Sequence, residues 1–284
     1  MTVLQRSMAF WRGRHKAAWA ARAALLLTLG LVVACSSDDE REYVERPVED
    51  IYNEAHATML ANDYFEAAEL FDEVERQHPY STWATKAQLM AAYSYYKINE
   101  YDQAILAADR FLQLHPGNES APYAFYLIAV SYYEQIADVG RDQNVTKMAL
   151  GSLQELVRRY PASEYARDAR LKIDLARDHL AGKEMEIGRF YLRRGTPIAA
   201  INRFRVVIED FQTTSHAAEA LHRLTEAYLQ LGVTKEAQTA AAVLGHNFPG
   251  SPWYQDSYLL LTGVDLRPQG DPESWITKTW KKVF

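Results

Sequence analysis

Cys35 is the single cysteine of the chain, and its position in the sequence indicates which chemical modification it undergoes. The first 34 residues carry five basic side chains and no acidic one, and the apolar run AALLLTLGLVVA then fills residues 23–34, directly before the cysteine. This order of parts is typical of a secretory signal peptide. The run is too short to span a bilayer as a helix, which takes about 20 apolar residues. A signal peptide is therefore predicted for residues 1–34.

The segment Val32-Val33-Ala34-Cys35 resembles the lipoprotein box of bacterial lipoproteins. The resemblance implies that Cys35 becomes the first mature residue and carries lipid on its sulfur and its amine. It also implies that Ser36, where an Asp would stop transport, sends the protein on to the outer membrane. Several acyl chains hold a protein on a membrane almost permanently, whereas one holds it only marginally. The alternative is a buried structural cysteine in a cytosolic protein. It does not explain why a basic region, an apolar run and a cysteine follow one another in this order.

The charge of the mature chain restricts its partners. Removal of residues 1–34 leaves 26 basic and 37 acidic side chains, a formal net charge of −11. This balance argues against nucleic acid as a partner. The next residues, 36–47 (SSDDEREYVERP), are charged and have no apolar period. With Cys35 they form a predicted lipidated and flexible tether, residues 35–47.

The sequence contains none of the common catalytic motifs: no glycine-rich phosphate loop, no His-Glu-x-x-His, no Gly-x-Ser-x-Gly and no cysteine pair. His78 and His115 occupy equivalent positions, where Tyr160, Phe211 and Phe248 stand elsewhere, so we interpret both as stacking residues at helix ends. No catalytic residue, metal ligand or cofactor is predicted. The chain is instead rich in tyrosine, with 18 residues, and tyrosines that face a groove suit peptide binding.

These aromatic residues belong to a unit that is written five times. Residues 78–97 (HPYSTWATKAQLMAAYSYYK) have counterparts beginning at residues 115, 160, 211 and 248. Each unit keeps an alanine, a packing residue four positions later and a helix stop twelve positions later: Ala67, Phe71 and Pro79; Ala104, Ala108 and Pro116; Ala149, Leu153 and Pro161; Ala200, Phe204 and Gln212; Ala237, Ala241 and Pro249. Small residues let two helices cross closely, and proline ends the pair.

The repeated pattern resembles the tetratricopeptide repeat over residues 48–262. The resemblance implies an all-α fold, a superhelix of about five helix pairs plus a final covering helix. We expect repeats 1–3 in residues 48–162, repeats 4–5 and the last helix in residues 163–262, and a basic aromatic tail in residues 263–284. Extra residues at 138–146 (DVGRDQNVT) predict a polar loop, either a contact surface or a plain solvated insert. Extra residues within 163–195 predict one long helix bent near Gly182, or two helices nearly in line.

The tail allows two interpretations. It ends in three aromatic and three basic residues: Trp275, Trp280 and Phe284, with Lys278, Lys281 and Lys282. These side chains suit packing on a partner subunit or at a lipid headgroup surface. The alternative is a disordered end.

A lipoprotein box followed by five repeats, with the phrases AYSYYK, DRFLQLHP, ELVRRYPASEYARDA and RGTPIAAINRF, resembles the BamD (ComL) family of the β-barrel assembly machinery. The resemblance implies a lipoprotein on the periplasmic face of the outer membrane. Its implied partners are the periplasmic repeats of BamA, other lipoproteins of the assembly complex and the C-terminal signals of unfolded outer-membrane proteins. The implied substrate-binding residues are Tyr64, His78, Tyr80, Ser81 and Trp83, with Tyr64 near the turn that holds the other four. The implied partner-binding residues are Arg194, Asn202 and Arg203.

Two other functions remain compatible with the residues. One is a repeat lipoprotein that serves another envelope process, as an adaptor for peptidoglycan enzymes or as a pilus pilotin. The other is an enzyme with an unrecognised site, which would require polar groups that converge in the groove.

Overall fold

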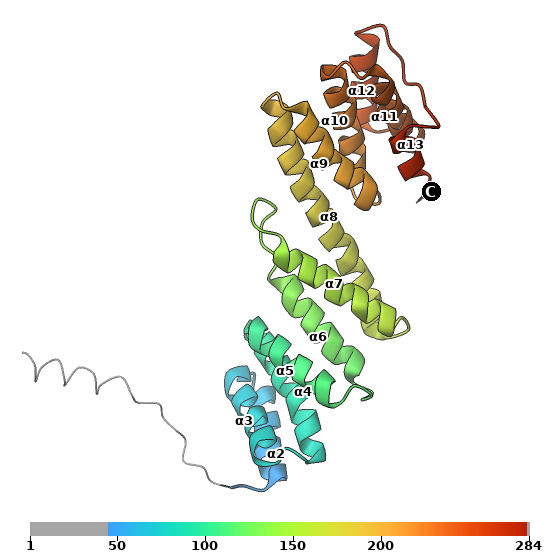
Figure 1. Ribbon diagram of the computed structural model, residues 1–284. Helices are drawn as coiled ribbons and strands as arrows, with labels where there is room; N and C mark the ends of the chain where they lie inside the picture. The colour runs from blue at the N-terminus through green and yellow to red at the C-terminus, as the bar shows by residue number, and fades with distance from the viewer. Residues whose placement is uncertain (1–44, 283–284) are drawn as a thin grey trace, which may run out of the picture. The chain divides into compact units, whose positions relative to one another are not determined.

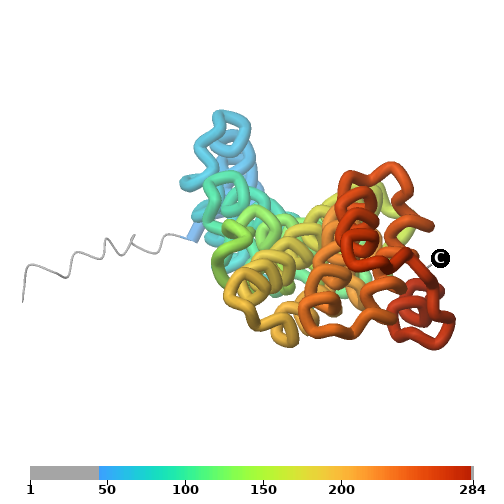
Figure 2. Tube along the Cα trace, turned by 90° about the horizontal axis from the view of Figure 1, so that it is seen from above, coloured from blue at the N-terminus to red at the C-terminus, as the bar shows by residue number. Residues whose placement is uncertain are grey.

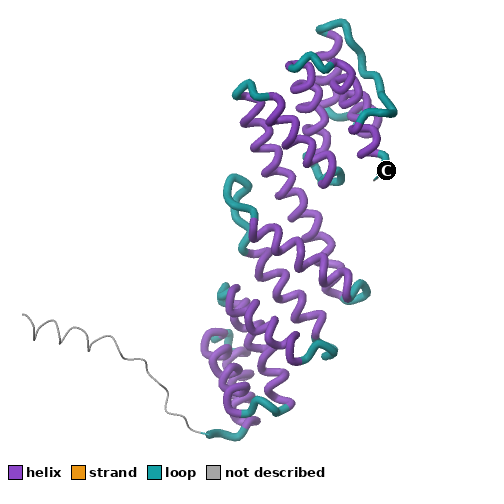
Figure 3. The backbone as a smooth tube through the Cα atoms, in the orientation of Figure 1, coloured by secondary structure: helices purple, strands orange, loops and turns teal. Residues whose placement is uncertain are grey.

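The computed structural model describes residues 45–282, so the predicted signal peptide, Cys35 and nearly all of the tether lie outside the described residues. From Arg46 onward the described residues belong to one compact unit. Every regular element in this part of the chain is a helix (Figure 3). The predicted all-α fold is confirmed.

The helices follow one another as pairs (Figure 1). The five pairs are α2 (Val48–Leu60) with α3 (Tyr64–Gln77), α4 (Thr82–Lys97) with α5 (Tyr101–Leu114), α6 (Ala121–Glu134) with α7 (Asn144–Arg159), α8 (Glu164–Arg193) with α9 (Pro197–Asp210), and α10 (Ala217–Gln230) with α11 (Thr234–Asn247). Each helix packs on the next, and the succession can be followed along the trace in Figure 2. Helix α12 (Pro252–Thr262) packs on α10 and α11 and is the predicted covering helix.

Turn residues at fixed positions end the first helix of four pairs. Asn62, Asn99, Gly195 and Gly232 each lie five positions before the repeat alanine, and all four have a positive φ between 63° and 74°. Glycine and asparagine tolerate this left-handed conformation best, which is why they stop helices here. Between pairs, the Ser81, Ser163 and Ser251 side chains accept a hydrogen bond from the backbone of the helix that follows. Such a cap contributes about 1 kcal/mol.

The repeat alanines and their packing partners form the core. Ala67, Ala104, Ala149, Ala200 and Ala237 are all fully buried. The residues four positions later, Phe71, Ala108, Leu153, Phe204 and Ala241, are fully buried as well. The register read from the sequence therefore corresponds to the helix crossings of the structure.

Helix α8 is a single helix of 30 residues, which agrees with the predicted long helix and not with two separate helices, while the bend near Gly182 stays a prediction. Its first half packs on the preceding pair, where Ala169 shares a core with Leu153 and Leu156. Its second half packs on the following pair, where Met185 shares a core with Phe204. One helix thus joins both halves of the array, and the division into two functional halves stays a prediction.

The loop between α6 and α7 spans residues 135–143, so it has the predicted length but lies three residues earlier than predicted. It ends at Gln143, because Asn144–Thr146 already form the first turn of α7. The buried Gln143 amide donates to the carbonyl oxygens of Asp138 and Arg141, both at 3.2 Å. Lys183 of α8 donates to the Gly140 carbonyl at 2.9 Å. The loop is therefore tied both to itself and to α8.

The tail differs from both predictions in its described part, residues 263–282. It ends in a further helix, α13 (Trp275–Trp280), whose Ile276 and Trp280 are buried in the core of the C-terminal pairs. The Trp275 indole donates to the Tyr228 hydroxyl at 3.0 Å, and the Arg205 guanidinium lies 4.7 Å from the Trp275 ring centroid. The two tryptophans thus pack on the chain's own repeats. Lys281 and Lys282 are exposed, and Phe284 lies beyond the described residues.

Candidate functional site

Four of the predicted substrate-binding residues lie at the turn between α3 and α4, which we call the turn surface: His78, Tyr80, Ser81 and Trp83. His78 donates from Nε2 to the Arg46 carbonyl oxygen at 2.7 Å, and Ser81 accepts from the Trp83 backbone N–H at 3.1 Å. Trp83 packs on Tyr52, with ring centroids 4.7 Å apart. Tyr80 is 101% exposed. Three of the four therefore hold the turn, and Tyr80 alone presents its whole ring to a ligand.

Tyr64 does not lie near the turn surface, so that part of the prediction was wrong. It is the first residue of α3, and the turn surface begins after the last one. A helix of 14 residues is about 21 Å long. At its own end of the pair, Tyr64 lies edge-on to Tyr93 at 6.1 Å, and Lys97 Nζ lies 5.4 Å from the Tyr64 ring centroid.

A second aromatic surface lies on α4, α6 and α8, and we call it the tyrosine face: Tyr93, Tyr96, Tyr123, Tyr126 and Tyr165. Spacings of three residues on α4 and on α6 place each pair on one side of its helix. Tyr165 of α8 bridges the second pair, with ring centroids 5.3 Å from Tyr123 and 5.2 Å from Tyr126. All five rings are half-buried. The sequence indicated the tyrosines of α4 and α6 by their number, but it gave no sign that Tyr165 completes the surface.

Electrostatics keep the tyrosine face neutral. Burial raises the pKa of Tyr96, Tyr123, Tyr126 and Tyr165, so their phenols stay protonated. The Tyr126 hydroxyl donates to Asp168 at 2.8 Å, and Lys172 donates to the same carboxylate at 3.1 Å. Burial opposes ionisation of Asp168, but these two hydrogen bonds outweigh it and hold the Asp168 pKa below its usual value. The face offers flat apolar rings with hydroxyl groups, which suits contact with an extended peptide.

The predicted partner-binding residues lie on α9 and at the end of α8, which we call the α8–α9 corner: Arg194, Asn202 and Arg203. Arg194 follows the last residue of α8, and its guanidinium lies 5.4 Å from the ring centroid of the exposed Phe190. Asn202 is exposed on α9. Arg203 donates from Nη1 to Glu184 Oε2 at 3.2 Å. Because both side chains of this pair are partly exposed, it contributes about 0–1 kcal/mol and leaves Arg203 available for a partner.

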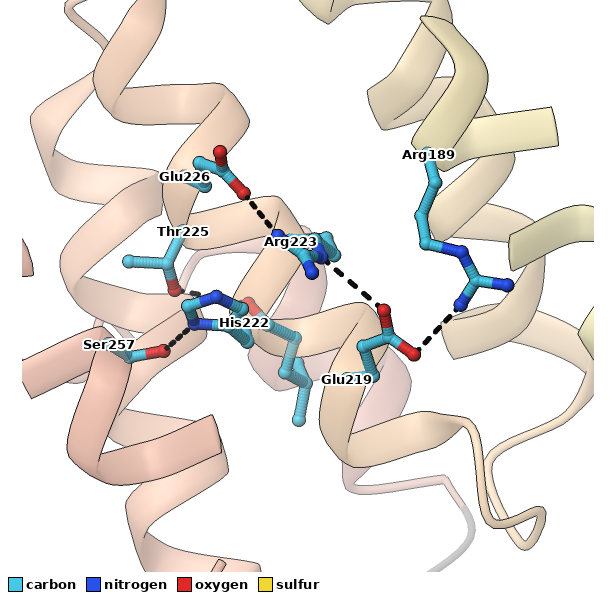
Figure 4. Close-up of polar contacts among 8 residues, drawn as sticks. Arg189, Glu219, His222, Arg223, Thr225, Glu226 and Ser257 are labelled. Atoms are coloured by element: carbon cyan, nitrogen blue, oxygen red, sulfur yellow. Dashed lines mark hydrogen bonds and ion pairs between the residues drawn. The ribbon is translucent and has the colours of Figure 1, made fainter. Parts of the chain in front are cut away.

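A charged network that was not predicted from the sequence lies between α8 and α10 (Figure 4). Arg189 donates to Glu219 at 2.9 Å, Arg223 donates to the other oxygen of Glu219 at 3.4 Å, and Arg223 also donates to Glu226 at 2.9 Å. Arg189 and Glu219 are 30 residues apart, so only the packing of two helices brings them together. The side chain of Glu219 is just 13% exposed and is shared by both arginines.

Three of the histidines make contacts within or between neighbouring elements of the fold. His78 donates to the Arg46 backbone as above, and the His115 ring lies tilted against Phe111, with ring centroids 5.6 Å apart. His222 bonds Ser257 at 2.9 Å. Within residues 45–282, no group of three or more His, Cys, Asp and Glu side chains is arranged to hold a metal ion. The same part of the chain has no helix with the length and apolar character needed to cross a membrane.

Comparison with known proteins gives a consistent result. The profile of the family YfiO, described as outer membrane lipoprotein, matches residues 44–244. A Caulobacter vibrioides protein named outer membrane protein assembly factor BamD is 52% identical over 252 residues, 88% of this chain and 83% of its own. A Rickettsia prowazekii protein of the same name is 44% identical over 237 residues, 83% and 94% of the two chains. Among solved structures, the TPR domain of P58(IPK) aligns with a TM-score of 0.40 and 14% identity, over 83% of this chain and 64% of that one.

Proposed function

The chain belongs to the YfiO family of outer membrane lipoproteins, and we propose that it is a lipid-anchored periplasmic adaptor that binds BamA and the C-terminal signals of unfolded outer-membrane proteins. Its relatives give it a role in outer-membrane protein assembly. The observation that carries the adaptor role is the array of five helix pairs with separate exposed surfaces, which fits binding better than catalysis. The anchor would be lipid on Cys35, as the order of basic region, apolar run and cysteine indicates.

The contact with BamA is proposed at the α8–α9 corner. Arginine and aromatic side chains dominate the binding energy of many protein interfaces, and this corner exposes Arg194 beside Phe190. Asn202 and Arg203 add polar groups one turn into α9. The corner is part of a helix pair whose core is fully buried, so its side chains are presented by a rigid support.

Arg203→Glu is expected to weaken the binding of BamA periplasmic repeats by about tenfold or more, because it replaces a donor with a repelling carboxylate. Helical content and melting temperature should change little, since the ion pair with Glu184 is partly exposed. Isothermal titration calorimetry with the purified repeats measures the affinity, and circular dichroism measures the fold.

Glu184 supplies the matched control for Arg203. Glu184→Arg breaks the same ion pair but keeps Arg203, so BamA binding should persist. The double variant Glu184→Arg/Arg203→Glu restores an ion pair in reverse, yet it should bind as weakly as Arg203→Glu. Full recovery in the double variant would mean that Arg203 acts only by holding Glu184, and the contact would then lie elsewhere.

Client binding is proposed at the turn surface, where Tyr80 projects fully into solvent. Tyr80→Ala is expected to weaken binding of a ten-residue peptide with the C-terminal sequence of an outer-membrane barrel protein by about tenfold, because aromatic anchors supply much of such affinity. The melting temperature should stay unchanged, since an exposed ring packs on nothing. Fluorescence anisotropy of the labelled peptide measures the effect.

Leu106→Ala is the control for Tyr80, because it removes an apolar side chain of 56% exposure from the neighbouring α5. It should leave peptide affinity unchanged. If Tyr126→Ala lowers the peptide affinity and Tyr80→Ala does not, clients bind the tyrosine face, and the assignment of the client site to the turn surface is wrong.

A further inference from the structure

The charged network of Figure 4 borders a groove on α8, α10 and α12, which we call the C-terminal groove. It consists of two adjoining pockets. The first has a volume of about 240 Å³ and is lined by Arg189, Leu192, Arg193, Arg223 and Glu226. The second has a volume of about 440 Å³ and is lined by His222, Arg223, Glu226, Asp256, Leu259 and Leu260. Arg223 and Glu226 belong to both pockets, so a ligand can reach from one to the other.

The first pocket carries one positive charge more than its carboxylates balance. Glu219 and Glu226 together accept from Arg189 and Arg223. Arg193, the third arginine, is exposed and forms no ion pair with any described residue. His222 adds no charge at neutral pH, because burial and then Arg223 lower its pKa below the ordinary value. The unbalanced positive charge of the first pocket therefore suits a ligand with a single anionic group.

The groove is held in shape before a ligand arrives. The Arg223 guanidinium lies 5.4 Å from the Trp253 ring centroid, and the His222 ring lies 5.2 Å from the same ring. His222 Nδ1 and Ser257 Oγ are 2.9 Å apart in the buried contact between α10 and α12. The contacts of Arg223 and His222 keep the wall of the groove in place, and the guanidinium of Arg193 can hold a carboxylate through paired hydrogen bonds.

The second pocket adds an apolar contact. Leu259 is 67% exposed and Leu260 is 40% exposed, on the side of α12 that faces the groove. Asp256 lies at the same end, where it disfavours a second acidic group on a ligand. The two pockets together match a ligand with one carboxylate at one end and large apolar side chains at the other.

We propose that the C-terminal groove is a second peptide-binding site, which takes a protein segment whose single acidic side chain pairs with Arg193 and whose apolar side chains cover Leu259 and Leu260. The site shares no residue with the turn surface or with the α8–α9 corner, although its Arg193 directly precedes Arg194 of that corner. Through this site the chain would bind a further protein, in addition to BamA and the unfolded outer-membrane proteins of the proposed function.

The test uses the purified chain and four labelled ten-residue peptides. Each peptide contains one glutamate and one Leu-Leu pair. The two are separated by a spacer of one, two, three or four Gly or Ser residues, a different length in each peptide. At least one peptide should bind with a Kd below about 1 mM, and its Glu-to-Lys counterpart should not bind. Arg193→Glu and Leu259→Asp should each weaken that binding by about tenfold. Arg194→Glu reverses the charge of the next residue, which lies outside the groove, and should change affinity less than about twofold.

Three results would overturn the proposal. They are failure of all four peptides to bind, equal losses from Arg193→Glu and Arg194→Glu, and complete displacement of the peptide by inorganic phosphate with no effect of Leu259→Asp. The last result would make the pocket a simple anion site. BamA binding by Arg193→Glu and Arg194→Glu is measured in parallel. Because only Arg194 lies at the α8–α9 corner, the groove and the proposed BamA contact can fail independently.

Discussion

Cys35→Ala is expected to move the protein from the membrane pellet to the soluble fraction of the envelope. The variant removes the sulfur that would carry lipid, and without acyl chains the net charge of −11 gives the mature chain no attraction to an anionic membrane. Helical content should not change, because the first described helix begins only at Val48. Ultracentrifugation of lysed cells, with palmitate labelling of the recovered protein, measures both location and lipid.

Ser36→Asp is the matched control for the anchor. It keeps the cysteine, so palmitate incorporation and membrane retention should persist, but the protein should shift from the outer to the inner membrane fraction on a density gradient. Retention of the Cys35→Ala protein in the pellet would refute lipid on this cysteine as the anchor.

Gly188→Ala is expected to destabilise the C-terminal pairs although alanine favours helices. A Cβ at this position would lie 2.3 Å from Phe204 Cε1 and 2.8 Å from two further atoms of a fully buried ring. Overpacking of this kind costs up to about 3 kcal/mol, which exceeds the gain in helix propensity of about 1 kcal/mol. For an array of this size, the melting temperature should fall by about 4–8 °C, as followed by circular dichroism.

Gly151→Ala makes the same change within α7, where nothing lies within 4 Å of the new Cβ. It should raise the melting temperature by about 2–4 °C, so the two variants are expected to shift in opposite directions. Phe204→Leu in the Gly188→Ala background should cost less than the two single changes added together, since the smaller side chain relieves the clash. A melting temperature that rises in Gly188→Ala would show that the ring moves freely and that the crossing is not tightly packed.

The fold was largely predictable because its information is local and repeated. Ala67 and Phe71 recur in register with Ala200 and Phe204, and each pair of positions is buried at a helix crossing. A single long helix at α8 was one of two predicted alternatives, since the helical pattern that begins after Ser163 stops only at the turn with Gly195. Patterns of this kind depend on residues a few positions apart, which is the range that sequence periodicity covers.

The candidate sites were less predictable because they depend on contacts between distant residues. Tyr64 was misplaced because it and His78 belong to the same repeat unit but lie at opposite ends of α3. The helix of the tail forms because Trp275 meets Tyr228 and Arg205, which are 47 and 70 residues away in sequence. The contact of Arg189 with Glu219 likewise requires that α8 and α10 already be packed. No periodic pattern encodes contacts of this range.

The central claim, that this chain is the adaptor that binds BamA, is tested most directly by purifying the lipidated full-length protein from detergent-solubilised envelopes and identifying what accompanies it. The account predicts that BamA is recovered with the wild-type protein and with Glu184→Arg, and is largely lost with Arg203→Glu. Absence of BamA from the wild-type preparation, with the protein intact and in the outer membrane fraction, would contradict it.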